Sequence, residues 1–211
     1  MKLQDKYQQV QQIMAEQFPQ EIMDVFKQSL MQLIEQKLES KALKEGDIAP
    51  DFTLLASDGT KVSLYTLLQK KRVVLSFFRG NWCPFCTTEL NHYQEALNRG
   101  ELSNITLIAI SPQTVEFNHK ATADNNLSFT LLSDEGNAIA EKYGIAFTLQ
   151  ENVRDIYKSL GADLSLFNGD TSYRLPIPAT YVIGQDKRII FAAVNTNYMD
   201  RADIDQIKAV L

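Results

Sequence analysis

The chain has 211 residues, 45% of them hydrophobic, which favours one domain with a sizeable core and an appendage over two full domains. Its 21 basic residues against 26 acidic ones give a formal charge of -5, which argues against binding to nucleic acid or to an anionic membrane surface. No apolar run approaches the core of a signal peptide or the roughly 20 residues of a membrane span. We therefore expect a soluble, cytoplasmic protein whose partners are small molecules or other proteins.

The N-terminal part of the chain is predicted to be helical. Apolar residues recur at the spacing of one helix face over Leu3–Leu38, and the pattern breaks near Pro19, so we expect two helices. Each has a single apolar stripe, which is typical of a structural element that packs on the main domain or on a second copy of the chain. A polar break at 44–47 then separates a helical extension over 1–45 from a main domain over 46–211. Such an extension could also support a homodimer.

The first half of the main domain begins with strands. A strand over 52–56 and a second over 61–64 are separated by a turn, which predicts a hairpin. The continuous apolar run at 73–78 is typical of a central strand that is buried on both faces. A helix follows, from Pro84 to about Leu97, because proline is well tolerated in a first helical turn, where its missing amide hydrogen is not needed.

The second half continues as mixed α/β structure. Apolar patterns predict strands at 105–110 and 129–132, a hairpin at 179–194, and helices at 114–125, 137–143, 153–160 and 202–211. Gly144 and Gly161 stand where two of these helices should end. The segment 161–177 has no clear period, so we expect a surface excursion there.

Two cysteines, Cys83 and Cys86, lie in the run WCPFC, directly after the buried strand and at the first turn of the next helix. Backbone amides and the helix dipole favour negative charge at that position, which lowers a thiol pKa. The thiolate can attack a disulfide or a peroxide oxygen, and the second thiol can resolve the product. As a structural staple, so short a loop would contribute only about 2 kcal/mol. The pair therefore predicts redox chemistry.

Other uses of the two cysteines fit less well. A structural zinc site needs about four ligands, and the chain adds only His92 and His119, at spacings that match no zinc motif. A hydrolase with a cysteine nucleophile and a histidine base would not explain the second cysteine three positions away. We therefore expect no metal and no cofactor, and we assign no role to either histidine.

Four stretches of the main domain carry a recognisable pattern. They are GDIAPDFTLLASDGTKVSL at Gly46–Leu64, VVLSFFRGNWCPFCTTEL at Val73–Leu90, FTLLSDEGNAIAEKYGI at Phe129–Ile145 and PIPATYVIGQDKRIIF at Pro176–Phe191. Together they resemble one known family, the peroxiredoxins of the AhpC/TSA (alkyl hydroperoxide reductase and thiol-specific antioxidant) superfamily. The resemblance implies a thioredoxin-like fold of the peroxiredoxin type, in which helices flank a central mixed β-sheet.

The resemblance also implies roles for the cysteines. In the family, the cysteine that attacks peroxide precedes a threonine and a glutamate, and Cys86 stands in that position before 87–89. The chain departs from the family at two supporting positions. Cys83 replaces a threonine that helps to hold the peroxide, and Pro178 replaces an arginine. The segment around Pro178 is instead similar to the cis-proline segment of thioredoxins, so we expect a cis peptide bond there.

Four further residues are candidates for supporting roles. Arg79 or Arg174 could replace the missing arginine, although a structural charge is the favoured interpretation of each. Trp82 could shield the thiols and shape a groove for a partner. Pro178 is expected to bring the backbone before it against the dithiol and to offer strand-like contacts to a substrate chain.

Three functions remain open from the sequence. The first is a thioredoxin-dependent peroxidase, in which Cys86 attacks hydrogen peroxide or an organic hydroperoxide and Cys83 resolves the sulfenic acid. The second is a thioredoxin-like protein disulfide oxidoreductase, in which Cys83 attacks and Cys86 resolves. The third is a noncatalytic redox sensor. The expected partners are a hydroperoxide or a protein disulfide as substrate and thioredoxin or a similar dithiol protein as reductant.

Overall fold

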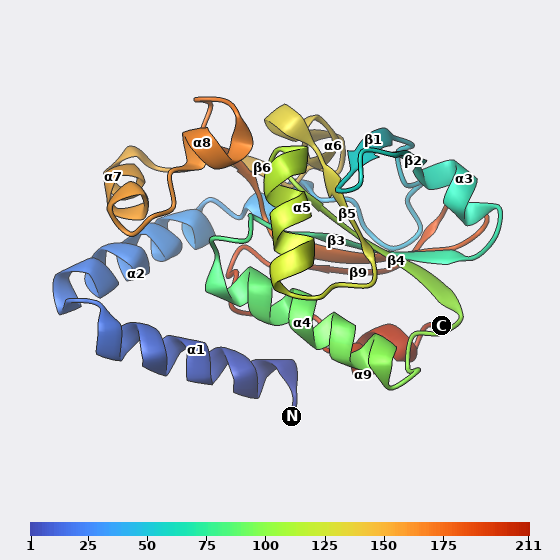
Figure 1. Cartoon of the computed structure of the whole chain (residues 1–211), viewed down its shortest axis with the longest axis horizontal. Helices are drawn as coiled ribbons and strands as arrows, with labels where there is room; N and C mark the ends of the chain where they lie inside the picture. The colour runs from blue at the N-terminus through green and yellow to red at the C-terminus, as the bar shows by residue number, and fades with distance from the viewer.

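A seven-stranded mixed sheet forms the centre of the computed structural model, which describes residues 1–211 (Figure 1). Across the sheet the strands are β2 (Lys61–Ser63), β1 (Thr53–Ala56), β5 (Thr130–Ser133), β4 (Ile105–Ser111), β3 (Arg72–Phe77), β8 (Ala179–Ile183) and β9 (Ile189–Val194). Strands β3, β4 and β5 are parallel, whereas β8 runs antiparallel to β3. The predicted strands, both hairpins and the mixed α/β class are confirmed.

Strand β3 shows why the sheet lies between two layers of helices. From Val73 to Phe77 its residues are buried on both faces, and successive side chains point to opposite sides. Val74 therefore packs in one core and Leu75 in the other. The first core lies under α4 (Pro84–Asn98), α5 (Val115–Asp124) and α9 (Ile204–Lys208). The second lies under α3 (Leu64–Leu68) and α6 (Ala138–Lys142).

The N-terminal residues form the two expected helices, α1 (Leu3–Gln17) and α2 (Gln20–Glu35), with Pro19 as the N-cap of the second. Figure 1 shows α1 running beside α4 and α2 turning toward α7 (Glu151–Ser159). Leu3 and Tyr7 are the buried residues of α1. We call the pair α1 and α2 the N-terminal hairpin.

Polar contacts hold both arms of the N-terminal hairpin. On α1, Lys6 Nζ lies 2.6 Å from a carboxylate oxygen of Glu95 in α4. On α2, Ser29 Oγ donates to Gln150 Oε1 over 2.9 Å, and Gln150 Nε2 donates back to the Ser29 carbonyl over 3.0 Å. The hairpin is therefore fixed on the main domain at two separate places. No helix in the structure has both the length and the apolar character needed to cross a membrane.

The expected surface excursion at 161–177 is in fact partly regular. It contains α8 (Leu164–Asn168) and β7 (Arg174–Pro176), and β7 pairs with β6 (Ala146–Thr148) in a small second sheet. These elements are three to five residues long, which is too short for a hydrophobic period to appear in the sequence. The short helix α3 and the 3-10 turns η1 (Leu38–Lys41) and η2 (Glu135–Asn137) were missed for the same reason.

Gly144, which follows α6, fits closely against η1. Its φ is +70°, and a Cβ atom there would lie 2.1 Å from the carbonyl oxygen of Lys41. We expect Gly144→Ala to lower the free energy of unfolding by about 3 kcal/mol in urea denaturation, because backbone strain and a backbone clash act together. Gly161 has φ +86° with open space around it, so Gly161→Ala should cost only about 1 kcal/mol. Equal losses of unfolding free energy in the two variants would contradict a backbone clash at Gly144.

Candidate active site

The dithiol lies where the chain passes from β3 into α4. Cys83 is the N-cap of the helix, Pro84 occupies its first turn, and Cys86 follows within the same turn. The loop before it turns tightly at Gly80, where a Cβ atom would lie 2.3 Å from the Trp82 ring nitrogen. The predicted arrangement of strand, short loop and helix N-terminus is therefore present, and the loop needs glycine so that Trp82 can fold back over it.

Both thiols are free, fully buried and surrounded by nitrogen donors. The backbone amide of Arg79 lies 3.4 Å from Cys86 Sγ, and Nη2 of the same residue lies 3.0 Å from Cys83 Sγ. Nη2 of Arg201 also lies 3.4 Å from Cys86 Sγ. Two guanidinium groups therefore face the dithiol, one from the loop just before it and one from a segment 115 positions after Cys86.

This environment shifts the pKa values of the two thiols in opposite directions. Burial by itself would raise the pKa of Cys86, but the hydrogen bond from Cys83 and the positive charges of Arg201 and Arg79 outweigh it. The pKa of Cys86 consequently lies well below its ordinary value. Burial raises the pKa of Cys83, and its hydrogen bond to Cys86 raises it further. This environment therefore favours the thiolate on Cys86 and the protonated thiol on Cys83.

Arg201 is the main residue that the sequence analysis missed. It forms an ion pair with Glu89, and both side chains are almost fully buried. Burial raises the pKa of Glu89 to about 6, against the opposing charge of Arg201. Glu89 lies one turn after Cys86 on the buried face of α4. A carboxylate on such a face needs a buried cation, and this was the signal that could have pointed to an arginine elsewhere in the chain.

Arg79 has an aromatic environment. Its guanidinium carbon lies 4.1 Å from the Tyr198 ring centroid and 5.3 Å from that of Trp82. Nη1 lies 3.4 Å from the Tyr157 hydroxyl, and Nε has no hydrogen-bond partner. No carboxylate pairs with this guanidinium, so the dithiol is its main source of negative charge. Of the sequence candidates, Arg79 and Trp82 therefore lie at the site.

Pro178 lacks the expected cis bond, and Arg174 makes an ion pair away from the thiols. The chain has no cis peptide bond, so the expected cis bond before Pro178 is wrong. Pro178 is buried just before Ala179, which pairs with Phe77 at the end of β3, so it enters the sheet beside the loop that carries Arg79. Arg174 pairs with Glu141 over 3.1 Å and does not contact the thiols.

The histidines also lie away from the sulfur atoms. His92 Nε2 is 3.2 Å from a carboxylate oxygen of Asp203, and His119 Nδ1 is 3.2 Å from the carbonyl oxygen of Ser57. No cluster of three or more histidine, cysteine or acidic side chains is placed to hold a metal ion.

The N-terminal hairpin also contributes to the site. Tyr7 of α1 is fully buried, and its ring packs edge-on against Phe85 at a centroid distance of 5.5 Å. Its hydroxyl has no hydrogen-bond partner. Burial raises the Tyr7 pKa, and the charges of Arg201, Glu89 and Cys86 also act on it. A neutral hydroxyl donor is therefore buried near Cys86.

Titration of the thiols tests this electrostatic description. Near neutral pH, the ultraviolet absorbance of the reduced protein should correspond to one thiolate per chain, because only the Cys86 pKa is lowered. Cys86→Ser should remove this signal. Cys83→Ala should retain it with a higher midpoint, because alanine cannot replace the hydrogen bond that the Cys83 thiol donates to Cys86. Two thiolates, or a thiolate that survives in Cys86→Ser, would contradict the assignment.

Comparisons with known proteins agree with this architecture. Residues 46–192 match the sequence profile described as the AhpC/TSA family. A protein named putative peroxiredoxin bcp from Helicobacter pylori (strain J99) is 36% identical over 101 residues, which cover 48% of this chain and 66% of the relative. Peroxiredoxin Bcp of Escherichia coli (strain K12) is 33% identical over 103 residues, 49% of this chain and 65% of the relative. The chain thus spans about two thirds of the length of these relatives.

Solved structures show the same fold. The crystal structure of peroxidoxin BcpB from Mycobacterium tuberculosis superposes with a TM-score of 0.62 at 22% identity, over 80% of this chain and 96% of that one. A peroxiredoxin 6 variant from Arenicola marina also gives a TM-score of 0.62, at 19% identity, over 79% of this chain and 70% of that one. The predicted thioredoxin-like fold of the peroxiredoxin type is confirmed.

Proposed function

Because this chain belongs to the AhpC/TSA family, we propose that it is a thiol-dependent peroxidase in which Cys86 is the peroxidatic thiol and Cys83 the resolving thiol. The observation that carries the proposal is the difference between the pKa values of the two thiols. Cys86 Sγ accepts hydrogen bonds from the Arg79 backbone amide and from the Arg201 guanidinium, and its pKa is lowered. The pKa of Cys83 is raised instead. The attacking and resolving roles follow from that difference.

The reaction proceeds in two covalent steps at these sulfur atoms. The Cys86 thiolate attacks one oxygen of the hydroperoxide, so a sulfur–oxygen bond forms and the oxygen–oxygen bond breaks. The leaving alkoxide or hydroxide takes up a proton and departs as an alcohol or water. Cys83, once deprotonated, then attacks the sulfenic sulfur, which forms the disulfide and releases water. Arg201 and Arg79 stabilise the negative charge on sulfur and on the departing oxygen.

A dithiol protein of the thioredoxin type is proposed to restore the reduced pair. It would reduce the Cys83–Cys86 disulfide and become oxidised itself. In the alternative of disulfide exchange, Cys83 would be the attacking thiol. The raised pKa of Cys83 supports the peroxidase instead. We also propose that 1–45 act as an extension of a main domain over 46–211, since the family profile begins at residue 46.

Peroxide consumption coupled to a thioredoxin, its reductase and NADPH tests the proposal. Sustained NADPH oxidation that depends on both peroxide and this protein is the expected result. Mass spectrometry of the oxidised chain should then show the loss of two hydrogen atoms and a Cys83–Cys86 disulfide. A single round of oxidation without turnover would identify a sensor. Reduction of a protein disulfide that depends on Cys83, without peroxide turnover, would identify an oxidoreductase.

A further inference from the structure

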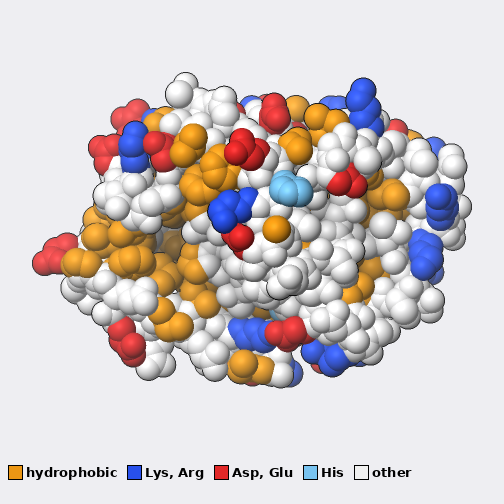
Figure 2. Space-filling model, in the orientation of Figure 1, with side chains coloured by type: hydrophobic (Ala, Val, Ile, Leu, Met, Phe, Trp, Pro, Cys, Tyr) orange, Lys and Arg blue, Asp and Glu red, His pale blue; other side chains and the backbone are white.

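An apolar cavity of about 340 Å³ opens beside the dithiol, between the N-terminal hairpin and the main domain. Eleven of its 14 lining residues are hydrophobic. Figure 2 shows hydrophobic side chains gathered around a hollow at the side of the molecule where α1, α2 and α7 lie. The cavity is large enough to enclose a small organic molecule.

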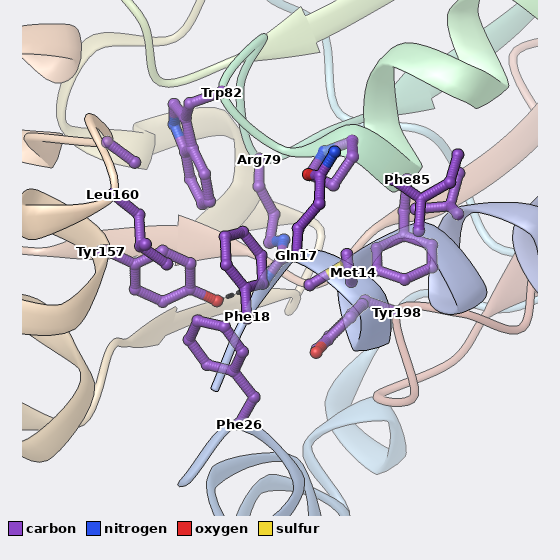
Figure 3. Close-up of a pocket in the computed structure, with 14 residues that line it drawn as sticks. Met14, Gln17, Phe18, Phe26, Arg79, Trp82, Phe85, Tyr157, Leu160 and Tyr198 are labelled. Atoms are coloured by element: carbon purple, nitrogen blue, oxygen red, sulfur yellow. Dashed lines mark hydrogen bonds between the residues drawn. The ribbon is translucent and has the colours of Figure 1, made fainter. Parts of the chain in front are cut away.

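The wall nearest the dithiol contains the one charged residue of the cavity, Arg79. Its side chain is 4% exposed, and its Nε atom has no hydrogen-bond partner. Figure 3 shows the guanidinium of Arg79 reaching the hydroxyl of Tyr157, with the Trp82 ring beside it. A buried donor without a partner favours a ligand that brings a hydrogen-bond acceptor to this end of the cavity. The same guanidinium contacts Cys83, so that acceptor would lie next to the dithiol.

The opposite wall comes from the N-terminal hairpin, through Val10, Met14, Phe18 and Phe26. Figure 3 shows the labelled side chains of this group facing the rings of Tyr157 and Tyr198 across the cavity. These residues precede the part of the chain that matches the family profile. The hairpin is held by its contacts with Glu95 and Gln150, so this wall is fixed in place.

We propose that this cavity binds the apolar group of an organic hydroperoxide, with the hydroperoxide end directed to Arg79 and the dithiol. The inference rests on the proposed peroxidase function and adds the place where the substrate is selected. The polar oxygen atoms of such a molecule match the wall that contains Arg79, and its apolar group matches the wall formed by the N-terminal hairpin. Hydrogen peroxide has no apolar group and gains nothing from the N-terminal hairpin.

A binding measurement tests the cavity without any turnover. Trp82 is the only tryptophan of the chain and lines the cavity, so its fluorescence reports on occupancy. The probe is 2-phenyl-2-propanol, the alcohol that corresponds to cumene hydroperoxide, added to the reduced protein. We expect a saturable change for the wild type. Methanol at the same concentrations should give none. A wild type that shows no saturable change would overturn the proposal.

Filling the cavity provides the matched variants. Val10→Phe places a larger side chain on the cavity wall, and Gln12→Phe makes the same kind of change on the exposed side of α1. The probe should bind about tenfold more weakly to Val10→Phe than to Gln12→Phe. Leu160→Phe fills the cavity from another wall, at an exposed residue outside α1. Weaker binding in this variant too would show that the result with Val10→Phe does not come from a disturbance of α1. Unchanged binding in both filled variants would overturn the proposal.

Kinetics then separate this inference from the proposed function. The ratio of kcat/KM for cumene hydroperoxide to that for hydrogen peroxide should fall about tenfold in Val10→Phe and Leu160→Phe, and should be unaltered in Gln12→Phe. An unaltered ratio in the filled variants would show that the cavity does not select the substrate. If the wild type turns over neither peroxide but binds the alcohol, the peroxidase proposal fails while the cavity remains a binding site for an apolar molecule.

Discussion

Cys86→Ser is expected to lower peroxide consumption by at least about a thousandfold, to the level of the uncatalysed reaction, because serine cannot form a stable anion at neutral pH or accept an oxygen atom. Cys83→Ser should behave differently. Its Cys86 thiolate still attacks the peroxide, but the sulfenic acid has no neighbouring thiol with which to condense. Dimedone should therefore label Cys83→Ser after one equivalent of peroxide and should not label Cys86→Ser.

Circular dichroism of both variants provides the folding control, since the two thiols are buried and a hydroxyl replaces each of them. The opposite pattern would reverse the assignment. If Cys86→Ser were labelled and Cys83→Ser were not, Cys83 would be the attacking thiol and disulfide exchange would become the better description of the site.

Arg201→Met should produce the second largest effect. The change removes a donor to Cys86 Sγ and one of the two positive charges that lower the Cys86 pKa. The second-order rate constant of Cys86 with hydrogen peroxide is expected to fall about a hundredfold, the loss that follows removal of one preorganised donor. The pH midpoint of thiolate formation should rise in the same variant. Stopped-flow measurements over a pH series would record both changes.

Stability complicates that variant, because Glu89 would be left buried without its partner. We expect Arg201→Met alone to lower the free energy of unfolding by about 3–5 kcal/mol. The double variant Arg201→Met/Glu89→Gln removes both charges, so it should recover most of this loss while the slow reaction with peroxide remains. Arg174→Met is the matched control, since that arginine pairs with Glu141 away from the thiols. A double variant that reacts as fast as the wild type would exclude Arg201 from the chemistry.

The low Cys86 pKa also links stability to pH. A thiol whose pKa is lower in the folded state contributes stability above its unfolded-state pKa, and this contribution is lost as the pH falls through the folded-state value. In Arg201→Met/Glu89→Gln the pH range of this loss should become narrower, because the folded-state pKa moves back toward the ordinary one.

Local sequence patterns correctly predicted the structural features that depend on residues close together in the chain. The buried run in β3, the tight loop and Pro84 together place WCPFC at a helix N-terminus, and the structure agrees. Arg201 could not be placed in this way, because 115 positions separate it from Cys86 and the loop that carries it has no hydrophobic period. The expected cis bond at Pro178 came from resemblance to thioredoxins, and a trans bond satisfies the same strand entry here.

Tyr7 and the cavity wall were missed for a related reason. The apolar stripe of α1 correctly predicted a helix with one face to bury, but a stripe does not show which surface it covers. Only the tertiary structure shows that α1 covers α4 and brings Tyr7 against Phe85, next to the dithiol.

The distance in sequence between Cys86 and Arg201 has a consequence for synthesis of the protein. The ribosome makes Cys86 115 residues before Arg201, so for much of translation the cysteine lacks one of its two guanidinium partners. The growing chain should therefore carry a thiol with a pKa closer to the ordinary value, which reacts only slowly with oxidants. Reactivity would appear only after the segment around Arg201 has left the ribosome and docked on α4, so incomplete chains would be spared oxidation of an exposed thiolate.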